Sequence, residues 1–308
     1  MKLSFRSAPL LPLLLGIVLA GCGKSGDSVA PVSSVTDADN AAVQRQLALH
    51  PELVDDNGLS TESSQVSTGA SPARLASTDE RRPLFFWRNI RSVDTQFEIT
   101  FADTDSTGRP TTAHVTVIRH LKGTFNVAMG DSASGDTLIH KPLADRSVRH
   151  LLLKRVLRPS EDRERCEGWR IAASSGLDVR SSNATTNITA IRVQSGALDT
   201  TITNPLALFR LRNILRLPAG STVTLTATTG ANDDVVILYT SFLRLRFHAN
   251  GDGTYTGTWD AQLFDGFRHF RVNALSHGTL FDPAAPYDSE AWSLPYRVSP
   301  ADPGDYIG

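Results

Sequence analysis

Apolar and polar positions alternate in short runs along the chain from about residue 83 onward. In the run Gln96–Phe101, Phe97, Ile99 and Phe101 alternate with polar neighbours, and this period of two places all three on one face of a strand. Similar runs predict strands at His114–His120, Gly123–Met129, Leu151–Leu157, Gly168–Ala173, Asn187–Gln194, Thr222–Thr228, Val235–Thr240, Leu243–His248, Thr254–Asp260, Phe267–Leu275 and Trp292–Val298. The pattern therefore predicts a mainly β fold.

Two antiparallel β-rich domains are expected, at 83–195 and 196–308. The central one is predicted to be a long curved sheet, with an α+β arrangement left open. Its ending, Gly168-Trp169-Arg170-Ile171 followed by Ser174-Ser175, resembles the last strands of NTF2-like or cystatin-like domains. That resemblance implies helices packed into the sheet.

The last third has short strands at regular spacing, which favours a β-sandwich. The stretch Asn250–Trp259 contains Asp-Gly-Thr-Tyr-Thr and resembles a hairpin of bacterial Ig-like domains. In it Tyr255 and Trp259 are expected to face inward, against Phe270, Val272 and Ala274 of the next strand. The resemblance implies an Ig-like sandwich, a fold that hosts many unrelated functions.

The N-terminus has a different pattern. Lys2 and Arg6 precede an apolar stretch, Leu10–Leu19, of about half the length that a membrane-spanning helix requires. This is typical of a signal peptide over residues 1–21.

The signal peptide ends in Leu19-Ala20-Gly21-Cys22, which resembles the lipobox of bacterial lipoproteins. The resemblance implies cleavage before Cys22 and acylation of its sulfur, so the lipid membrane is the expected partner. Residue 23 is Gly and not Asp. In lipoproteins of two-membrane bacteria this favours the outer membrane over the inner one, so the resemblance implies an outer-membrane location for this chain. The alternative is an ordinary signal peptide with a chance cysteine.

Residues 22–82 are rich in Ser, Thr, Ala, Asp and Gly, and no aromatic residue occurs between Phe5 and Phe85. Such a composition predicts a flexible tether. One short helix is expected at Ala41–Leu49, with Asp39 or Asn40 as the N-cap and Pro51 as the stop.

Composition and charge bear on three points. The formal net charge is −1, without the basic excess of a nucleic-acid-binding protein. Positive residues gather between Arg146 and Arg170 among acidic ones, a pattern that favours a solvated surface over the alternative of a defined anionic site. With Cys22 acylated, Cys166 has no cysteine partner, so no intramolecular disulfide is expected.

Two motifs suggest chemistry. Met129-Gly130-Asp131-Ser132 follows a predicted strand and resembles the Gly-Asp-Ser block of SGNH-type esterases, but the chain lacks the Asp-x-x-His that this family uses as the base. Asp103, Asp105 and Thr107 match the first half of a calcium loop, whereas His114 stands where an acidic ligand is required. Turn chemistry explains both motifs without a nucleophile or a metal, and no cofactor is expected.

These features together predict a membrane-anchored envelope lipoprotein with a non-enzymatic binding or structural body, whose partner is a protein or glycan and not a nucleic acid. Two alternatives stay open. One is an envelope hydrolase that uses Ser132 as nucleophile and His120, His140 or His150 as base. The other is a small apolar ligand held by the central sheet near Phe97, Val117 and Trp169. Tyr287, Trp292 and Tyr296 are expected to close the end of the sandwich, or else to form an aromatic binding strip.

Overall fold

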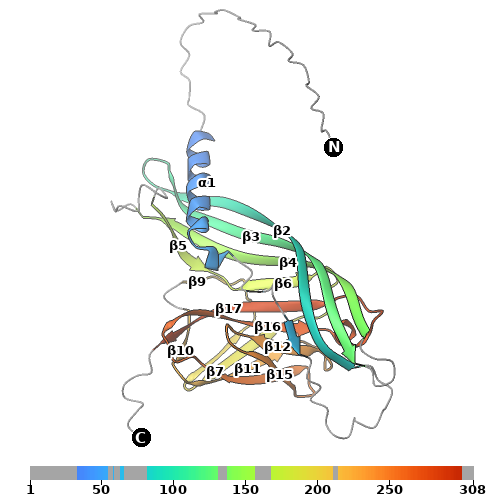
Figure 1. Cartoon of the computed structure of the whole chain (residues 1–308). Coiled ribbons are helices and arrows are strands. Elements are labelled where there is room, and N and C mark those ends of the chain that lie inside the picture. Colours follow the sequence, from blue (N-terminus) through green and yellow to red (C-terminus); the bar gives the residue numbers. More distant parts are fainter. Residues whose placement is uncertain are drawn as a thin grey trace, which may run out of the picture.

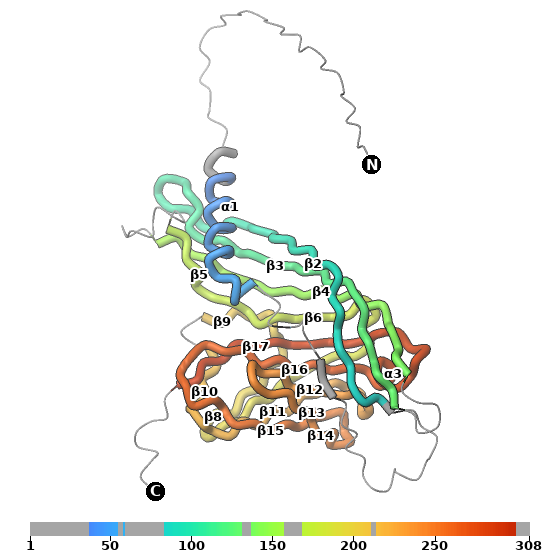
Figure 2. Tube along the Cα trace, viewed as in Figure 1, coloured from blue at the N-terminus to red at the C-terminus, as the bar shows by residue number. Residues whose placement is uncertain are grey.

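The computed structural model describes residues 33–54, 58, 63–65, 82–130, 137–156, 168–210 and 214–299, and the chain in these ranges is mainly β (Figures 1 and 2). Its helices are α1 (Ser33–Ala48), the short 3₁₀ helix η1 (Pro51–Leu53) and α3 (His277–Phe281). Its strands are β1 (Ser63–Gln65), β2 (Arg82–Thr104), β3 (Pro110–Gly130), β4 (Thr137–Arg155), β5 (Trp169–Ser174), β6 (Leu177–Ser181), β7 (Ala190–Ser195), β8 (Leu198–Ile202), β9 (Phe209–Arg210), β10 (Leu215–Pro218), β11 (Thr222–Thr228), β12 (Val235–Tyr239), β13 (Arg244–Arg246), β14 (His248–Ala249), β15 (Thr254–Asp260), β16 (Gly266–Leu275) and β17 (Ser289–Ser299).

Strands β2, β3 and β4 are 23, 21 and 19 residues long, well beyond the usual length of a strand. The strands predicted separately at His114–His120 and Gly123–Met129 are one strand, β3, so that division was wrong. A β-bulge in β2 between Ile90 and Ser92 bends the pair at this point. A Cβ on Gly123 would lie 2.0 Å from the Asn89 carbonyl oxygen, so this glycine permits the close approach without ending the strand.

The first sheet runs through most of the molecule, in the order β1-β2-β3-β4-β6-β17-β16-β12-β13. The short strand β6 joins its two parts, because it pairs with β4 on one side and with β17 on the other. β10 lies parallel to β17, while the other pairings are antiparallel. The expected boundary at 195/196 falls in the β7–β8 hairpin, and the sheet itself is continuous across both expected domains.

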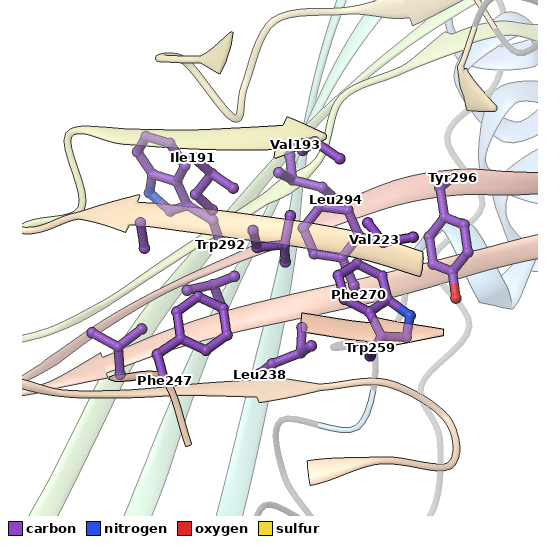
Figure 3. Packing of buried hydrophobic residues seen from close by; sticks show 14 of the residues in the cluster. Ile191, Val193, Val223, Leu238, Phe247, Trp259, Phe270, Trp292, Leu294 and Tyr296 are labelled. Atoms are coloured by element: carbon purple, nitrogen blue, oxygen red, sulfur yellow. The ribbon is translucent and has the colours of Figure 1, made fainter. Parts of the chain in front are cut away.

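A second sheet, β14-β15-β11-β7-β8, packs on the C-terminal part of the first. Figure 3 shows the core between them, where Trp292, Leu294 and Tyr296 of β17 meet side chains of β7 and β11. Tyr255 and Trp259 are 1% and 7% exposed, as the alternation predicted. The predicted fold class, mainly β with antiparallel sheets and a β-sandwich arrangement, is confirmed.

Helix α1 packs on the long-strand part of the first sheet (Figure 1). Ala42, Val43 and Leu47 are buried against strands β3, β4 and β5. The helix begins at Ser33, so the N-cap expected at Asp39 or Asn40 was wrong. Asp39 is instead fully buried inside the helix, where its carboxylate pairs with Arg155 and accepts a 3.3 Å hydrogen bond from Trp169 Nε1.

Lys141 ties the two parts of the first sheet together. This β4 residue is 3% exposed, and its Nζ donates to the carbonyls of Gly278, Asp282 and Ala285 at 2.9, 2.7 and 2.7 Å. It thereby satisfies carbonyl groups in and after α3, as a basic group at a helix C-terminus does.

Several predicted features lie outside the described residues, namely the signal peptide at 1–21, Cys22, Ser132 and Cys166. Within the described ranges, no helix combines the length and apolar character required to cross a membrane.

Candidate functional site

A row of charged side chains crosses the first sheet. Asp94 of β2, His120 of β3, Arg146 of β4, Arg180 of β6 and Glu290 of β17 are directly opposite one another in successive strand pairs. Directly opposite residues share a face of the sheet, with Cβ atoms about 5 Å apart. The row therefore places two arginines and a histidine side by side, with an acid at each end.

Arg180 is held by the acidic end of this row. Its guanidinium lies 2.9 Å from Glu290 Oε1 and 3.2 Å from Asp178 Oδ2. Glu290 is fully buried, and it also accepts hydrogen bonds from the Ile188 amide and, at 3.1 Å, from Trp292 Nε1. Arg180 is therefore oriented by partners that the sandwich core fixes in place.

The two carboxyl groups beside Arg180 influence each other. Burial raises the pKa of Asp178, and Arg180 offsets part of that rise. Burial also raises the pKa of Glu290, against the hydrogen bond from the Ile188 amide and the charge of Arg180, while Asp178 raises it further.

A pocket of about 380 Å³ opens over this row. We call it the cationic pocket. It is lined by His120, Leu121, Lys122, Ala144, Asp145, Arg146, Val148, Asp178, Arg180, Ser181 and Ser182. Its volume lies in the range of about 300–1,000 Å³ that small-molecule sites occupy. The pocket is on the central part of the first sheet, next to the point where that sheet enters the sandwich.

Asp145 of the pocket wall is neutralised from the other face of the sheet. Its carboxylate and the Arg88 guanidinium form an ion pair, and both side chains are completely buried. Tyr287 donates to Asp145 Oδ2 at 3.2 Å, and the Arg88 guanidinium stands over the Tyr287 ring at 5.4 Å. The negative charge of Asp145 is thus compensated behind the pocket, which leaves Asp178 as the acid facing the pocket cations.

A second hollow, of about 350 Å³, lies at the end of the sandwich. It is lined by Thr185, Thr186, Thr229, Gly230, Ala231, Asp233, Asp234, Ser276, His277 and Gly278. Burial raises the pKa of Asp234, and the charges of Asp233 and Asp288 add to that rise. Among the described residues, no group of three or more His, Cys, Asp or Glu side chains is placed to hold a metal ion.

The predicted calcium-loop residues form the turn between β2 and β3. Asp105 Oδ1 accepts hydrogen bonds from the Thr107 hydroxyl, the Thr107 amide and the Arg109 amide at 2.6, 2.8 and 3.0 Å. These bonds lower the pKa of the Asp105 carboxyl, the Thr107 hydroxyl having the largest effect. Asp103 accepts from Thr112 at 2.8 Å. Turn chemistry thus accounts for the presence of all three predicted residues, Asp103, Asp105 and Thr107.

The histidines proposed as a base for Ser132 lie in three different surroundings. His120 lines the cationic pocket. His140 Nδ1 is 2.6 Å from Asn126 Oδ1, and the His150 amide donates to the Ser175 hydroxyl at 2.8 Å. Ser132 lies outside the described residues, so the hydrolase alternative stays a prediction.

The aromatic residues near the C-terminus are core residues. Tyr287, Trp292 and Tyr296 are each at most 2% exposed. Trp292 and Tyr296 belong to the sandwich core, while Tyr287 packs on Phe125 on the opposite face of the sheet. Of the residues expected to line an apolar pocket, Val117 and Trp169 are buried in the cluster beneath α1, whereas Phe97 is 38% exposed.

Sequence reasoning missed the cationic pocket. The sequence pattern placed Arg146 only in a charged stretch and predicted no role for Lys122 or Arg180. The available signal was limited to β6, where Asp178 and Arg180 alternate with the buried Leu177 and Val179. On β4, Arg146 is flanked on its own face by Ala144 and Val148, so alternation does not mark it. That these positions become neighbours depends on the pairing of β4 with β6, which the pattern within a strand does not reveal.

Comparison with known proteins does not assign the chain to a family. No protein-family model matches the chain, and no curated protein matches it. A solved structure of extended synaptotagmin 2, comprising its SMP domain and two C2 domains, aligns over 84% of this chain and 66% of that chain, with 6% identity and a TM-score of 0.15. A TM-score this low carries no inference about fold or function.

Proposed function

We propose that this chain is a lipid-anchored protein of the bacterial cell envelope, whose β body is a non-enzymatic binding module with the cationic pocket as its ligand site. The anchor is supported by the Leu19-Ala20-Gly21-Cys22 motif after a short apolar stretch. The outer membrane is the favoured location in a cell with two membranes.

Helix α1 sets how far the body stands from the lipid. The chain from Cys22 to Ser33 covers eleven Cα–Cα steps, so it spans at most about 40 Å when fully extended. Because α1 packs on the long strands, the segment that links the proposed anchor to the body is shorter than the expected tether of residues 22–82. The proposed anchor thus holds the α1 end of the body close to the bilayer.

The observation that carries the binding function is the alignment of Lys122, Arg146 and Arg180 around one pocket on a continuous sheet. Sites on paired strands are more rigid than sites on loops, which lowers the entropy lost on binding. Guanidinium and ammonium groups carry hydrogen-bond donors and no acceptor, so the cations of the pocket suit recognition of an anion.

The anchor is tested by expressing the chain in a bacterium supplied with an alkyne-tagged fatty acid. The unaltered chain is expected to incorporate the tag and to fractionate with membranes. Cys22→Ser is expected to lose both properties, while Cys166→Ser, a matched cysteine control, keeps them. Equal labelling of the Cys22→Ser variant would contradict the proposal.

A further inference from the structure

We infer that the cationic pocket binds a small organic anion, a phosphate or carboxylate group carried on an apolar body. This inference rests on the proposed binding function and adds the chemical class of the ligand. It follows from the placement of like charges, from the partners of each arginine and from the nature of the pocket wall.

The two arginine charges in the row repel each other. Arg146 lies directly opposite Arg180, and the charge of Asp178 acts on both of them. Like charges directly opposite each other on paired strands destabilise a sheet. An anion between the two arginines converts this repulsion into attraction, so the arrangement favours the occupied pocket.

The two arginines differ in what they already bind. Arg180 is fixed by Asp178 and Glu290, with its side chain 53% exposed. Arg146 is exposed, and among the described residues no carboxylate lies within the 4.0 Å of an ion pair with its guanidinium. A planar guanidinium offers two parallel N–H donors that match two oxygens of a carboxylate or phosphate. Arg146 is therefore the main donor to the ligand, and Arg180 is a preoriented second cation.

The apolar part of the ligand is inferred from the same wall. Ala144 and Val148 flank Arg146 on β4 and point to the same face as it does, because residues two apart share a face. The methylene groups of Lys122 and Arg146 extend this apolar surface. About 380 Å³ accommodates an aromatic ring together with a phosphate group, whereas a bare inorganic anion would leave the apolar wall uncovered.

The test is isothermal titration calorimetry on the full lipidated chain in a neutral detergent, with four soluble probes. Phenyl phosphate and benzoate carry an anion on an apolar ring. Inorganic phosphate carries the charge alone, and benzylamine carries the ring with the opposite charge. We expect phenyl phosphate or benzoate to bind more tightly than inorganic phosphate, and benzylamine not to bind. The ranking of phenyl phosphate against benzoate distinguishes a phosphate ligand from a carboxylate.

Three variants distinguish binding in this pocket from binding to positive charge elsewhere on the surface. Arg146→Gln is expected to weaken binding of the preferred probe at least about tenfold, since it removes a charge-assisted hydrogen-bond pair. Arg146→Lys keeps the charge but loses the planar fork, so it should restore only part of the affinity. Lys154→Gln removes a positive charge from an exposed position on the same face of β4, away from the pocket, and should bind like the unaltered chain.

Three results would overturn the inference: benzylamine binding as tightly as the anions, equal losses in Arg146→Gln and Lys154→Gln, or absence of binding by every probe. Because Arg146 is exposed and faces a like charge, the Arg146→Gln variant should melt at or above the temperature of the unaltered chain, which checks that the fold is intact. Failure of fatty-acid labelling at Cys22 would refute the anchor and leave the titration result standing, so the two proposals fail separately.

Discussion

At the scale of single residues, burial changes the acid–base behaviour of His269. The ring of this β16 residue forms a T-shaped pair with the Phe267 ring, at a centroid distance of 4.9 Å. Burial, helped by the positive charge of Arg149, lowers the pKa of His269 from 6.5 to about 3. Between these pH values the unfolded chain binds a proton at this position and the folded chain does not. The contribution of neutral His269 to the stability of the folded chain is thus fully present above pH 6.5, and it is lost as the pH falls through about 3.

We therefore expect acid to lower the free energy of unfolding through His269 by at most about 1.4 kcal/mol per pH unit over this range. His269→Gln cannot titrate and should make the dependence on pH shallower. His248→Gln, at an exposed position on β14, should leave it unchanged. Urea unfolding at pH 7, 6, 5 and 4 measures the three slopes. If the His269→Gln chain kept the slope of the unaltered chain, His269 would not be a source of acid sensitivity.

At the scale of elements, the docking of α1 depends on Asp39. This carboxylate is completely buried between Arg155 and Trp169, and the Arg155 guanidinium stands 4.9 Å from the centre of the Trp169 ring. Removing one partner of a buried ion pair leaves the other charge uncompensated, at a cost of about 3–5 kcal/mol.

Asp39→Asn keeps the size of the side chain and is expected to loosen α1 from the sheet. If the substitution lowers the free energy of local opening of α1 by about 3 kcal/mol, amide hydrogen exchange in the helix becomes roughly one hundred times faster. Asp37→Asn makes the same chemical change at an exposed position of α1 and is the control. Equal exchange rates in the two variants would show that the ion pair does not hold the helix in place.

The same elements show what the sequence could predict and what it could not. Period-two alternation located β11 and β15 at their observed bounds, because each has one face in the sandwich core. Local pattern failed where structure depends on distant partners. The length of β3 depends on the bulge opposite Gly123, and the buried position of Asp39 depends on Arg155. The cationic pocket was missed for the same reason, since its arginines meet only through the pairing of β4 with β6.

At the scale of the whole molecule, the two expected domains share secondary structure. Strand β6 of the first half pairs with β17 of the second, through the register Trp292 to Asp178 and Glu290 to Arg180. Strand β7 of the first half is in turn a central strand of the second sheet, between β11 and β8. Separating the halves at 195/196 would therefore remove pairing partners from both sheets and expose the core that includes Ile191, Val193 and Trp292.

A continuous sheet of this kind predicts cooperative unfolding of the body as one unit. We expect the full chain to show one thermal transition, with coincident melting by far-ultraviolet and near-ultraviolet circular dichroism. Fragments 33–195 and 196–308 are each expected to lack a fixed tertiary structure when made alone, because buried strands would become unpaired edges. Co-expression of the two fragments is the matched control and should restore the near-ultraviolet signal, since it supplies every strand without the covalent link. If fragment 33–195 alone gave a native near-ultraviolet spectrum and its own sharp transition, the boundary at 195/196 would separate independent domains. The pairing of β6 with β17 would then be a docking contact that adds little to the stability of either half.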